Sequence, residues 1–373
     1  MIIKNGMVFG EDGQFVQKNL FIEGEKITSE TCEAPGEEID AKGMYVIPGL
    51  TDIHFHACVG YDFCDGTKEA IDKIAEYQLK NGITTICPAS MTFSEEQLTK
   101  IFQNAAHYDN QSGATLVGIN MEGPFISMEK KGAQNPKYIH TPDVSMFHRL
   151  QKAADGLIKL VDIAPETEGA MEFIDEVSSE VCVSLAHTAA DFDTARKAFS
   201  KGANHVTHLY NAMPPYSHRA PGVIGAACDD DKTMVEIICD GIHLHPSTVR
   251  TTFKMFGDDR IILISDSMMA CGLEDGQYTL GGQDVTVKGN LATLTKEGNL
   301  AGSVTNLMDC MRTAVRDMGI PLEKAVKCAT MNPAKSIGIY DQYGSLKPGK
   351  IADVVILDRD LEIRYIIKNG KIC

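Results

Sequence analysis

Two histidines stand one residue apart in the stretch GLTDIHFHACVGYDF (49–63). Residues i and i+2 of a β-strand point to the same side, so a strand here would place His54 and His56 on one face. Two neutral imidazoles on one face can bind one metal ion. A second pair with the same spacing, His243 and His245, shows that such pairs also arise elsewhere in the chain. The pair alone leaves both packing and metal binding open.

The elements that would position this pair follow from the apolar pattern. Short apolar runs recur through the middle of the chain, and most are followed by stretches with helical periodicity. The helix signal is clearest in TKEAIDKIAEYQLKNG (67–82), which Gly82 ends, and Asp191 opens a similar stretch. Alternating strands and helices predict an α/β fold, a (β/α)8 TIM-like barrel. The eight expected strands lie within 50–56, 83–90, 115–123, 158–166, 181–188, 205–211, 234–243 and 261–267.

The two ends of the chain have a different pattern. Residues 1–47 and 341–373 read as short β-branched strands separated by turns, with "IKNG" in both segments. We therefore expect one small β-sandwich domain built from both termini, and a catalytic barrel over residues 48–340. Hairpin signals in 271–300 predict an insertion after the eighth barrel strand.

Polar residues stand at the carboxyl ends of the apolar runs, where such a barrel carries its active site. Burying carboxylates and imidazoles is costly unless they are paired or bind a metal. One such residue can be a satisfied core histidine, whereas a set from separate strands predicts a metal site. The set comprises His54, His56, Ser90, Glu122, Glu166, His187, His208, Asp240, His243 and Asp266.

The donor types indicate the chemistry. Imidazole with carboxylate favours zinc, iron(II) or another first-row ion over magnesium or calcium. Such an ion lowers the pKa of a bound water to about 7 and polarises a carbonyl. A nearby carboxylate can then move the proton, and Asp266, after the run IILIS (261–265), is our candidate; its alternative role is to cap a helix. We expect metal-assisted hydrolysis.

The composition of the chain limits the classes of binding partner that we expect. The 373 residues carry a net charge of -16, which argues against a general binder of nucleic acid or anionic membranes. The 11 cysteines include no C-x-x-C pair, which favours reduced thiols. The chain shows neither a signal-peptide pattern at its start nor an apolar run of membrane-spanning length. We expect a cytoplasmic protein with a small-molecule substrate.

These residues, in this order, resemble the amidohydrolase superfamily. Many members carry a carboxylated lysine at the end of strand 4, but here Lys159 lies at the start of that run, and MEGPF (121–125) places Glu122 after strand 3. The whole chain closely resembles the N-acetylglucosamine-6-phosphate deacetylase family. The matching motifs also include KKGAQNP (130–136), LAHTAAD (185–191), THLYNAMPP (207–215), HRAPG (218–222), DGIHLHP (240–246) and LAGS (300–303).

The resemblance implies a role for each matching residue. It assigns a first metal to Glu122, His187 and His208, and a second to His54 with His56, giving one or two divalent ions per subunit, zinc or iron(II). Asp266 matches the general acid/base. Arg219 and His243 match phosphate-binding cations, with Arg219 reaching the neighbouring active site of a homodimer. Further substrate contacts fall on Ala133, Gln134, Asn211, Ala212, Leu300, Ala301 and Gly302.

Gln134 departs from the family pattern. Many members have a histidine here that contacts the substrate near the acetyl carbonyl. Glutamine can donate a hydrogen bond but cannot carry a proton or a charge. We hypothesise that Gln134 still orients the carbonyl, and its presence leaves the preference between glucosamine and galactosamine substrates open.

The expected reaction is hydrolysis of the N-acetyl group of N-acetylglucosamine 6-phosphate to acetate and glucosamine 6-phosphate. Alternatives are an N-acetylgalactosamine-6-phosphate deacetylase and an amidohydrolase acting on a cyclic amide or an N-acyl amino acid. A third alternative, a metal or sugar-phosphate sensor without catalysis, would require loss of the catalytic acid, and Asp266 is present.

Overall fold

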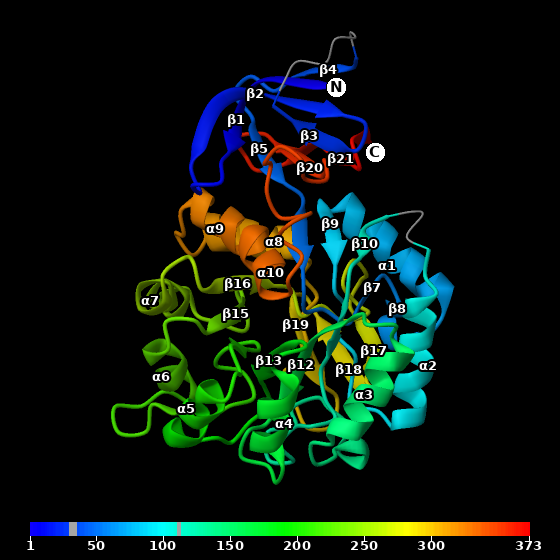
Figure 1. Cartoon of the computed structure of the whole chain (residues 1–373), viewed down its shortest axis with the longest axis vertical. Helices are drawn as coiled ribbons and strands as arrows, with labels where there is room; N and C mark the ends of the chain where they lie inside the picture. Colours follow the sequence, from blue (N-terminus) through cyan, green and yellow to red (C-terminus); the bar gives the residue numbers. More distant parts are fainter. Residues whose placement is uncertain (30–35, 110–112) are drawn as a thin grey trace.

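Strands from both ends of the chain lie side by side above a larger part built from parallel strands and helices (Figure 1). This computed structural model describes residues 1–29, 36–109 and 113–373. Within these residues, every helix is too short or too polar to cross a lipid bilayer. The cysteines at described positions are free thiols, as the scattered spacing predicted.

The terminal sheet has eight strands, in the order β22-β21-β20-β5-β1-β2-β3, with β4 paired to β1. Its central strand β20 is buried on both faces because alternate side chains enter two different cores. Val354 and Ile356 pack into the sheet's own core, whereas Val355 and Leu357 pack into the main core below. The strands are β1 (Ile2–Phe9), β2 (Phe15–Glu23), β3 (Lys26–Thr28), β4 (Glu38–Asp40), β5 (Tyr45–Pro48), β20 (Val354–Leu357), β21 (Ile363–Lys368) and β22 (Lys371–Ile372).

Parallel strands form the framework of the larger part. One sheet has the order β10-β9-β6 and another runs β11 to β16 in chain order, and a bridge between Ala89 and Asn120 joins the two. Each of the eight predicted strand segments contains a strand, which confirms the α/β class. The strands are β6 (Leu50–Asp52), β9 (Ile83–Ile86), β10 (Thr115–Leu116), β11 (Ile119–Met121), β12 (Ile158–Ile163), β13 (Cys182–Leu185), β14 (His205–Val206), β15 (Met234–Ile238) and β16 (Ile261–Ile264).

Helices follow the parallel strands, and their caps explain where they begin. The Thr67 side chain accepts a hydrogen bond from Ala70 N at 3.2 Å, and Asp191 accepts one from Thr194 N at 2.8 Å, so both predicted starts are confirmed. The helices are η1 (Phe63–Asp65), α1 (Lys68–Lys80), α2 (Glu95–Ala106), η2 (Pro136–Tyr138), α3 (Val144–Ala153), α4 (Ala170–Val177), α5 (Phe192–Ser200), α6 (Gly222–Asp229), α7 (Pro246–Phe256), α8 (Leu307–Arg316), α9 (Leu322–Ala329) and α10 (Met331–Ser336).

Two antiparallel features accompany the parallel framework. The predicted insertion after strand β16 is a three-stranded meander of β17 (Gly276–Leu280), β18 (Gln283–Lys288) and β19 (Leu291–Leu294). Gln283 of this meander donates a hydrogen bond to the carbonyl oxygen of Ala133, which joins the insertion to the loop after β11. A short hairpin, β7 (Ala57–Cys58) and β8 (Tyr61–Asp62), follows the first histidine pair.

The histidine pair itself differs from the prediction in one respect. Strand β6 ends at Asp52, so His54 and His56 lie in the loop beyond it rather than on one face of a strand. Strand alternation therefore does not explain why the two rings converge. The loop is held by backbone bonds instead, from Asp266 N to His54 O at 2.9 Å and from His56 N to Ser267 O at 2.9 Å.

Candidate metal centre and active site

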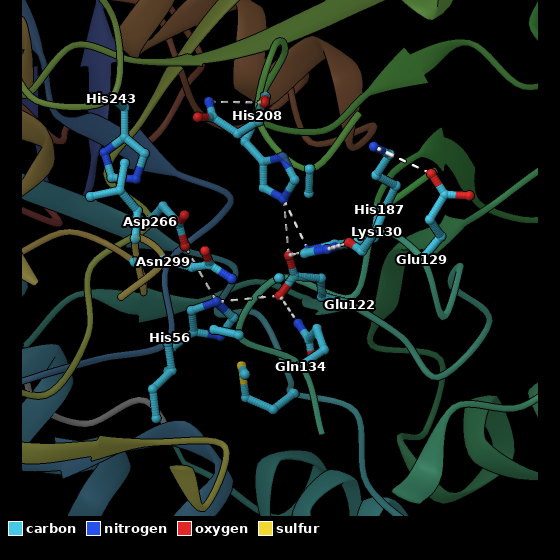
Figure 2. Close-up of a pocket in the computed structure, with 18 residues that line it drawn as sticks. His56, Glu122, Glu129, Lys130, Gln134, His187, His208, His243, Asp266 and Asn299 are labelled. Carbon is cyan, nitrogen blue, oxygen red and sulfur yellow. Dashed lines mark hydrogen bonds and ion pairs between the residues drawn. The ribbon is translucent and has the colours of Figure 1, made fainter. Parts of the chain in front are cut away.

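A cavity of about 360 Å³ opens at the carboxyl ends of the parallel strands, and most of the predicted site residues line it (Figure 2). The His54 side chain lies fully buried below the cavity lining. Of the other polar residues at strand ends, Ser90, Glu166 and Asp240 do not line the cavity; Glu166 is exposed and accepts a hydrogen bond from Thr188 Oγ1. The predicted residues in the lining are His56, Glu122, Ala133, Gln134, His187, His208, Asn211, Ala212, His243, Asp266, Leu300 and Gly302.

Glu122 is the centre of the cluster. It follows β11 directly and is 2% exposed. Its Oε1 atom lies 3.1 Å from His187 Nε2 and 3.3 Å from His208 Nε2, and these ligand atoms are close enough together to hold one ion. Its Oε2 atom lies 3.3 Å from His56 Nε2. One carboxylate therefore faces histidines from both predicted metal groups.

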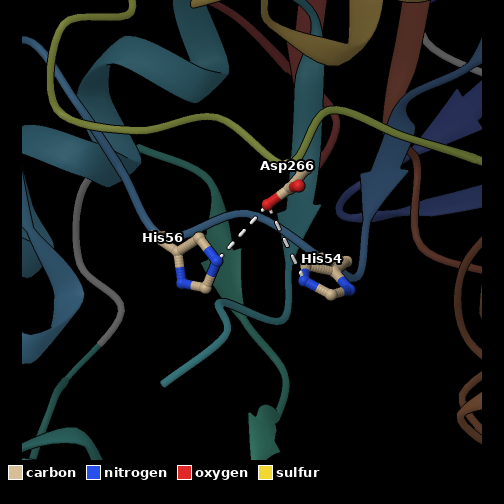
Figure 3. A group of neighbouring side chains, drawn as sticks. All are labelled: His54, His56 and Asp266. Atoms are coloured by element: carbon tan, nitrogen blue, oxygen red, sulfur yellow. Dashed lines mark ion pairs between the residues drawn. The ribbon is translucent and has the colours of Figure 1, made fainter. Parts of the chain in front are cut away.

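The second group joins His54 and His56 to Asp266 (Figure 3). Asp266 Oδ1 lies 3.3 Å from His56 Nε2 and 3.8 Å from His54 Nε2. Asp266 was predicted as the proton carrier, and the structure places it also within reach of any ion that these histidines bind. The two groups lie against each other because His54 Nε2 is 3.3 Å from Glu122 Oε1.

The hydrogen-bond partners of the histidine ring nitrogens indicate which nitrogen of each ring is free to bind a metal ion. The Nδ1 atoms of His187 and His56 face the carbonyl oxygens of Lys130 and Ala89 at 2.9 and 3.3 Å, and His54 Nδ1 faces a carboxylate. Since those acceptors fix the proton on Nδ1, each neutral ring directs an Nε2 lone pair at the cluster.

A lone pair that faces carboxylate oxygens needs a cation between them. His54 Nε2 is buried and has no hydrogen-bond partner among the described residues. The Nε2 atoms of His187 and His208 lie 3.2 Å apart, and both lie within 3.3 Å of Glu122 Oε1. The residues present therefore fit a divalent ion with imidazole and carboxylate ligands.

Electrostatics keep both carboxylates of the cluster ionised. Burial alone would raise the pKa of Glu122, but His54, His187 and His208 outweigh it and hold that pKa well below its ordinary value. Burial likewise opposes ionisation of Asp266, but when His54 and His56 carry a second proton on Nε2 in place of an ion, the hydrogen bond from His56 and the charges of both rings lower the pKa of Asp266. Ionised oxygens are the form that binds a metal or accepts a proton.

Backbone strain is concentrated at the same positions. His187, His208 and Asp266 have φ values of 44°, 30° and 47°, in a region that residues other than glycine rarely adopt. Each follows the carboxyl end of a parallel strand within two residues. Such strain persists only where the surroundings enforce it, and it is concentrated at functional sites. Here it turns three side chains out of their strand directions and toward the cavity.

The two predicted phosphate-binding cations, His243 and Arg219, line different cavities. His243 lines the cavity, and its Nδ1 atom lies 2.7 Å from Asp240 Oδ2, both side chains being buried. Burial opposes the charge on the ring, but Asp240 raises the pKa of His243 above its ordinary value. Arg219 is exposed and lines a different cavity near the start of α6. Ala301 is buried beside the lining residues Leu300 and Gly302.

Several polar residues of the site were not predicted. Glu236 and Asp162 lie within strands β15 and β12, fully buried under the cluster, and Lys130 and Asn299 line the cavity. Burial would raise the pKa of Glu236, but His54 and His205 lower it to about 2. The available signal was a lone acid within an apolar run, as in MVEII (234–238) and LVDI (160–163).

An α/β fold with imidazole and carboxylate clusters at its strand ends defines a metal-dependent hydrolase class, and comparison with known proteins identifies the family. The chain belongs to the Amidohydrolase family, whose pattern matches residues 45–373.

Individual relatives within this family are named for two related deacetylase activities. The N-acetylglucosamine-6-phosphate deacetylase of Bacillus subtilis (strain 168) is 38% identical over 382 residues, covering 100% of this chain and 93% of the relative. The N-acetylgalactosamine-6-phosphate deacetylase of Escherichia coli O157:H7 is 33% identical, covering 87% of this chain and 86% of the relative.

Solved structures agree with these relatives. A variant of the N-acetyl-D-glucosamine-6-phosphate deacetylase from Mycobacterium smegmatis, in complex with N-acetyl-D-glucosamine-6-phosphate, superimposes with a TM-score of 0.93 at 31% identity, covering 100% of this chain and 98% of that one. The enzyme from Thermotoga maritima gives a TM-score of 0.89 at 30% identity, covering 100% and 99%. The resemblance noted in the sequence motifs is therefore confirmed over the full chain.

Proposed function

We propose that this chain is a divalent-metal-dependent deacetylase that hydrolyses N-acetylglucosamine 6-phosphate to acetate and glucosamine 6-phosphate. The observation that carries the proposal is the pair of ligand groups meeting at Glu122, with Asp266 at the edge of the same cavity. Relatives that carry this activity in their names, at 30–38% identity over the full chain, support it.

Glu122, His187 and His208 would hold one ion, and His54 with His56 a second. When bound, a divalent ion polarises the amide carbonyl and makes a water molecule acidic enough to attack near neutral pH. Zinc and iron(II) suit these donors. The ionised Asp266 carboxylate takes the proton from the attacking water and delivers it to the amine nitrogen as the C–N bond breaks.

Other residues orient the substrate. His243, charged through its contact with Asp240, provides a cation for the phosphate within the cavity, and Asn211 with Ala212 lies beside it in the lining. Arg219 is exposed and does not line the cavity that holds the metal ligands of its own chain, which agrees with a role across a homodimer interface. We propose that each Arg219 enters the partner's active site.

The fold supports an assignment of domains. We propose that residues 48–340 form a (β/α)8 catalytic barrel and that residues 1–47 and 341–373 form a β-sandwich domain. Two separate cores support this division: Ile22, Ile27 and Ile367 belong to the terminal core, whereas the main core contains Ile83 and Leu263. Edge strand β3 is also covered, since Ile27 N donates to Lys350 O at 3.0 Å. A cytoplasmic location stays a prediction.

N-acetylgalactosamine 6-phosphate is the second candidate substrate. The Escherichia coli O157:H7 relative named for that activity supports it, and the two substrates differ only in the configuration of one hydroxyl group.

The test is acetate release from both phosphosugars by metal-stripped protein and by protein reconstituted with zinc or iron(II). We expect turnover only after reconstitution, and faster turnover with N-acetylglucosamine 6-phosphate. Folded, metal-loaded protein that releases no acetate from either compound would refute the proposal. Faster turnover of N-acetylgalactosamine 6-phosphate would favour the second candidate.

A further inference from the structure

Glu236 lies at the middle of strand β15, directly beneath the cavity, and is 0% exposed. It does not line the cavity and cannot touch a substrate there. A carboxylate buried at this depth is costly unless every oxygen is paired. Its two oxygens are paired, and the contacts of one of them involve residues from both predicted metal groups. Glu236 therefore contacts candidate metal ligands as well as filling space in the core.

One oxygen holds ligands from both groups. Glu236 Oε2 lies 2.9 Å from His54 Nδ1 and accepts a hydrogen bond from the backbone N of His208 at 3.1 Å. The first contact fixes the His54 ring with its Nδ1 proton toward the strand and its Nε2 lone pair toward the carboxylates of Glu122 and Asp266, at 3.3 and 3.8 Å. The second contact holds the strained backbone of His208, whose φ is 30°.

The other oxygen is held from the opposite side. Glu236 Oε1 lies 3.1 Å from His205 Nε2, and His205 Nδ1 lies 2.7 Å from Ser336 Oγ in α10. His205, Glu236 and His54 are all 0% exposed. The chain Ser336–His205–Glu236–His54 therefore holds the carboxylate from both sides, and its three inner members are closed to solvent.

We propose that Glu236 is a positioning residue of a two-metal centre: it fixes the tautomer and direction of His54, so that the site of His54, His56 and Asp266 can bind the second ion. The inference rests on the proposed function, because it presumes that both sites bind metal. Carboxylates that orient ligand histidines in this way commonly change metal affinity about 10- to 100-fold when removed.

The competing explanation is that Glu236 only neutralises two buried histidines and stabilises the fold. The two explanations differ in which metal is lost. A positioning residue affects the second ion more than the first, because Glu236 contacts the ring of His54 but reaches the first group only through the backbone N of His208. A purely structural residue lowers thermal stability and weakens both ions together.

Four variants separate these explanations. Glu236→Ala removes both contacts, and Glu236→Asp keeps the charge but withdraws it by one methylene. Glu236→Gln can keep an oxygen toward His54 while its amide donates to His205, which can switch tautomer because Ser336 Oγ also accepts. Ser336→Ala is the matched control, since it removes the outermost link and leaves the contact between Glu236 and His54 intact.

The experiment titrates metal-stripped protein with Co²⁺, followed by visible absorption and metal analysis, with melting temperature recorded for each variant. We expect Glu236→Ala and Glu236→Asp to weaken the second equivalent about 10- to 100-fold and to weaken the first, which Glu236 reaches only through the backbone of His208, by clearly less. Glu236→Gln should recover most of that affinity, and Ser336→Ala should match the parent. If Glu236→Ala fails to fold, Glu236→Asp and Glu236→Gln still provide the comparison.

Two results would overturn the inference: parent-like binding of both equivalents by Glu236→Ala or Glu236→Asp, or equal weakening of both equivalents with a lowered melting temperature. Failure of the proposed function can be distinguished from failure of this inference, because it would appear as absent acetate release in the unsubstituted protein. A parent that binds metal but releases no acetate refutes the function, whereas a parent that deacetylates with two ions, alongside unaffected variants, refutes only the role of Glu236.

Discussion

The side-chain amide of Gln134 donates a hydrogen bond from Nε2 to Glu122 Oε2 at 2.7 Å. Its Oε1 atom accepts one from the backbone N of Thr92, also at 2.7 Å, so the orientation of the amide is fixed from both ends. The sequence hypothesis gave Gln134 the task of orienting the substrate carbonyl. The structure shows one donor of this amide directed at a candidate metal ligand.

Replacing Gln134 should therefore act first on the metal. Gln134→Met has a similar volume but removes both hydrogen bonds, which frees the Glu122 carboxylate to rotate. We expect a loss of about 10- to 100-fold in the affinity for the first metal equivalent, with a fall in kcat/KM at limiting metal that saturating metal restores. Metal titration of stripped protein and steady-state assays at limiting and at saturating metal would measure the two effects.

The same assays distinguish a role of Gln134 in positioning Glu122 from the original hypothesis that Gln134 orients the substrate carbonyl. If Gln134 orients the carbonyl, Gln134→Met would lower kcat/KM even when excess metal fills the site, and metal affinity would not change. Gln134→Glu is an informative companion, since a carboxylate 2.7 Å from Glu122 would repel it unless a proton or a metal lies between them.

Asp266→Asn should abolish most turnover while preserving the fold. The amide cannot accept the proton of the attacking water, and general acid–base catalysis of this kind contributes about 10²- to 10⁴-fold. We expect kcat to fall within that range and the dissociation constant of N-acetylglucosamine 6-phosphate to change little. Stopped acetate release with retained substrate binding by calorimetry would confirm this, and a fall in kcat of less than tenfold would remove Asp266 from the proton-transfer step.

Much of the fold could be predicted because parallel strands are buried on both faces and read as continuous apolar runs. Strand β16, IILI (261–264), is buried at every position and was recognisable on that ground. Helix starts were recognisable from local chemistry, as Asp191 shows by capping α5. The exact ends were less predictable. Strand β6 stops at Asp52, and the loop beyond it bonds both to the segment after β16 and, through Ala89 N to Phe55 O, to the segment after β9.

The cluster was predictable in its members but not in its support. Glu122, His187 and His208 stand at strand ends, where a polar residue after an apolar run is conspicuous. Glu236 stands inside a strand, and its partner His54 is 182 positions away in the chain, so nothing local identifies the contact. Arg219, in contrast, was predicted from the sequence, but its predicted role requires the active site of a second subunit.

The pair of His243 and Asp240 predicts a pH dependence of substrate binding. Because Asp240 raises the pKa of His243, the ring is protonated below that raised value and attracts the phosphate; it loses this charge as the pH rises through it. Asp240→Asn removes the partner and lowers the pKa of His243. We therefore expect the KM for the phosphosugar to begin rising at lower pH in the variant than in the parent.

The measurement is KM against pH for both proteins, with unphosphorylated N-acetylglucosamine as the control substrate. Ionisation of the phosphate is the same in both series, so a difference between parent and variant reports on the enzyme. Asp266 also acts electrostatically on His243 and is unchanged in both proteins. Superimposable profiles, or an equal displacement with the unphosphorylated sugar, would contradict the role of His243 in phosphate binding.

Arg219 offers a test of the shared active site. If its guanidinium reaches the partner's cavity, Arg219→Ala should raise the KM for the phosphosugar at least tenfold, since an arginine–phosphate contact is charge-assisted and bidentate, and should change kcat little. Arg219→Ala and Asp266→Asn, each weak or inactive alone, should then complement each other when the two chains are mixed. A hybrid dimer contains one cavity with an intact Asp266 from one subunit and an intact Arg219 from the other. Restored activity at low substrate concentration would establish that the arginine acts across the interface, whereas mixtures no better than the average of the two variants would show that each chain uses its own Arg219 or none.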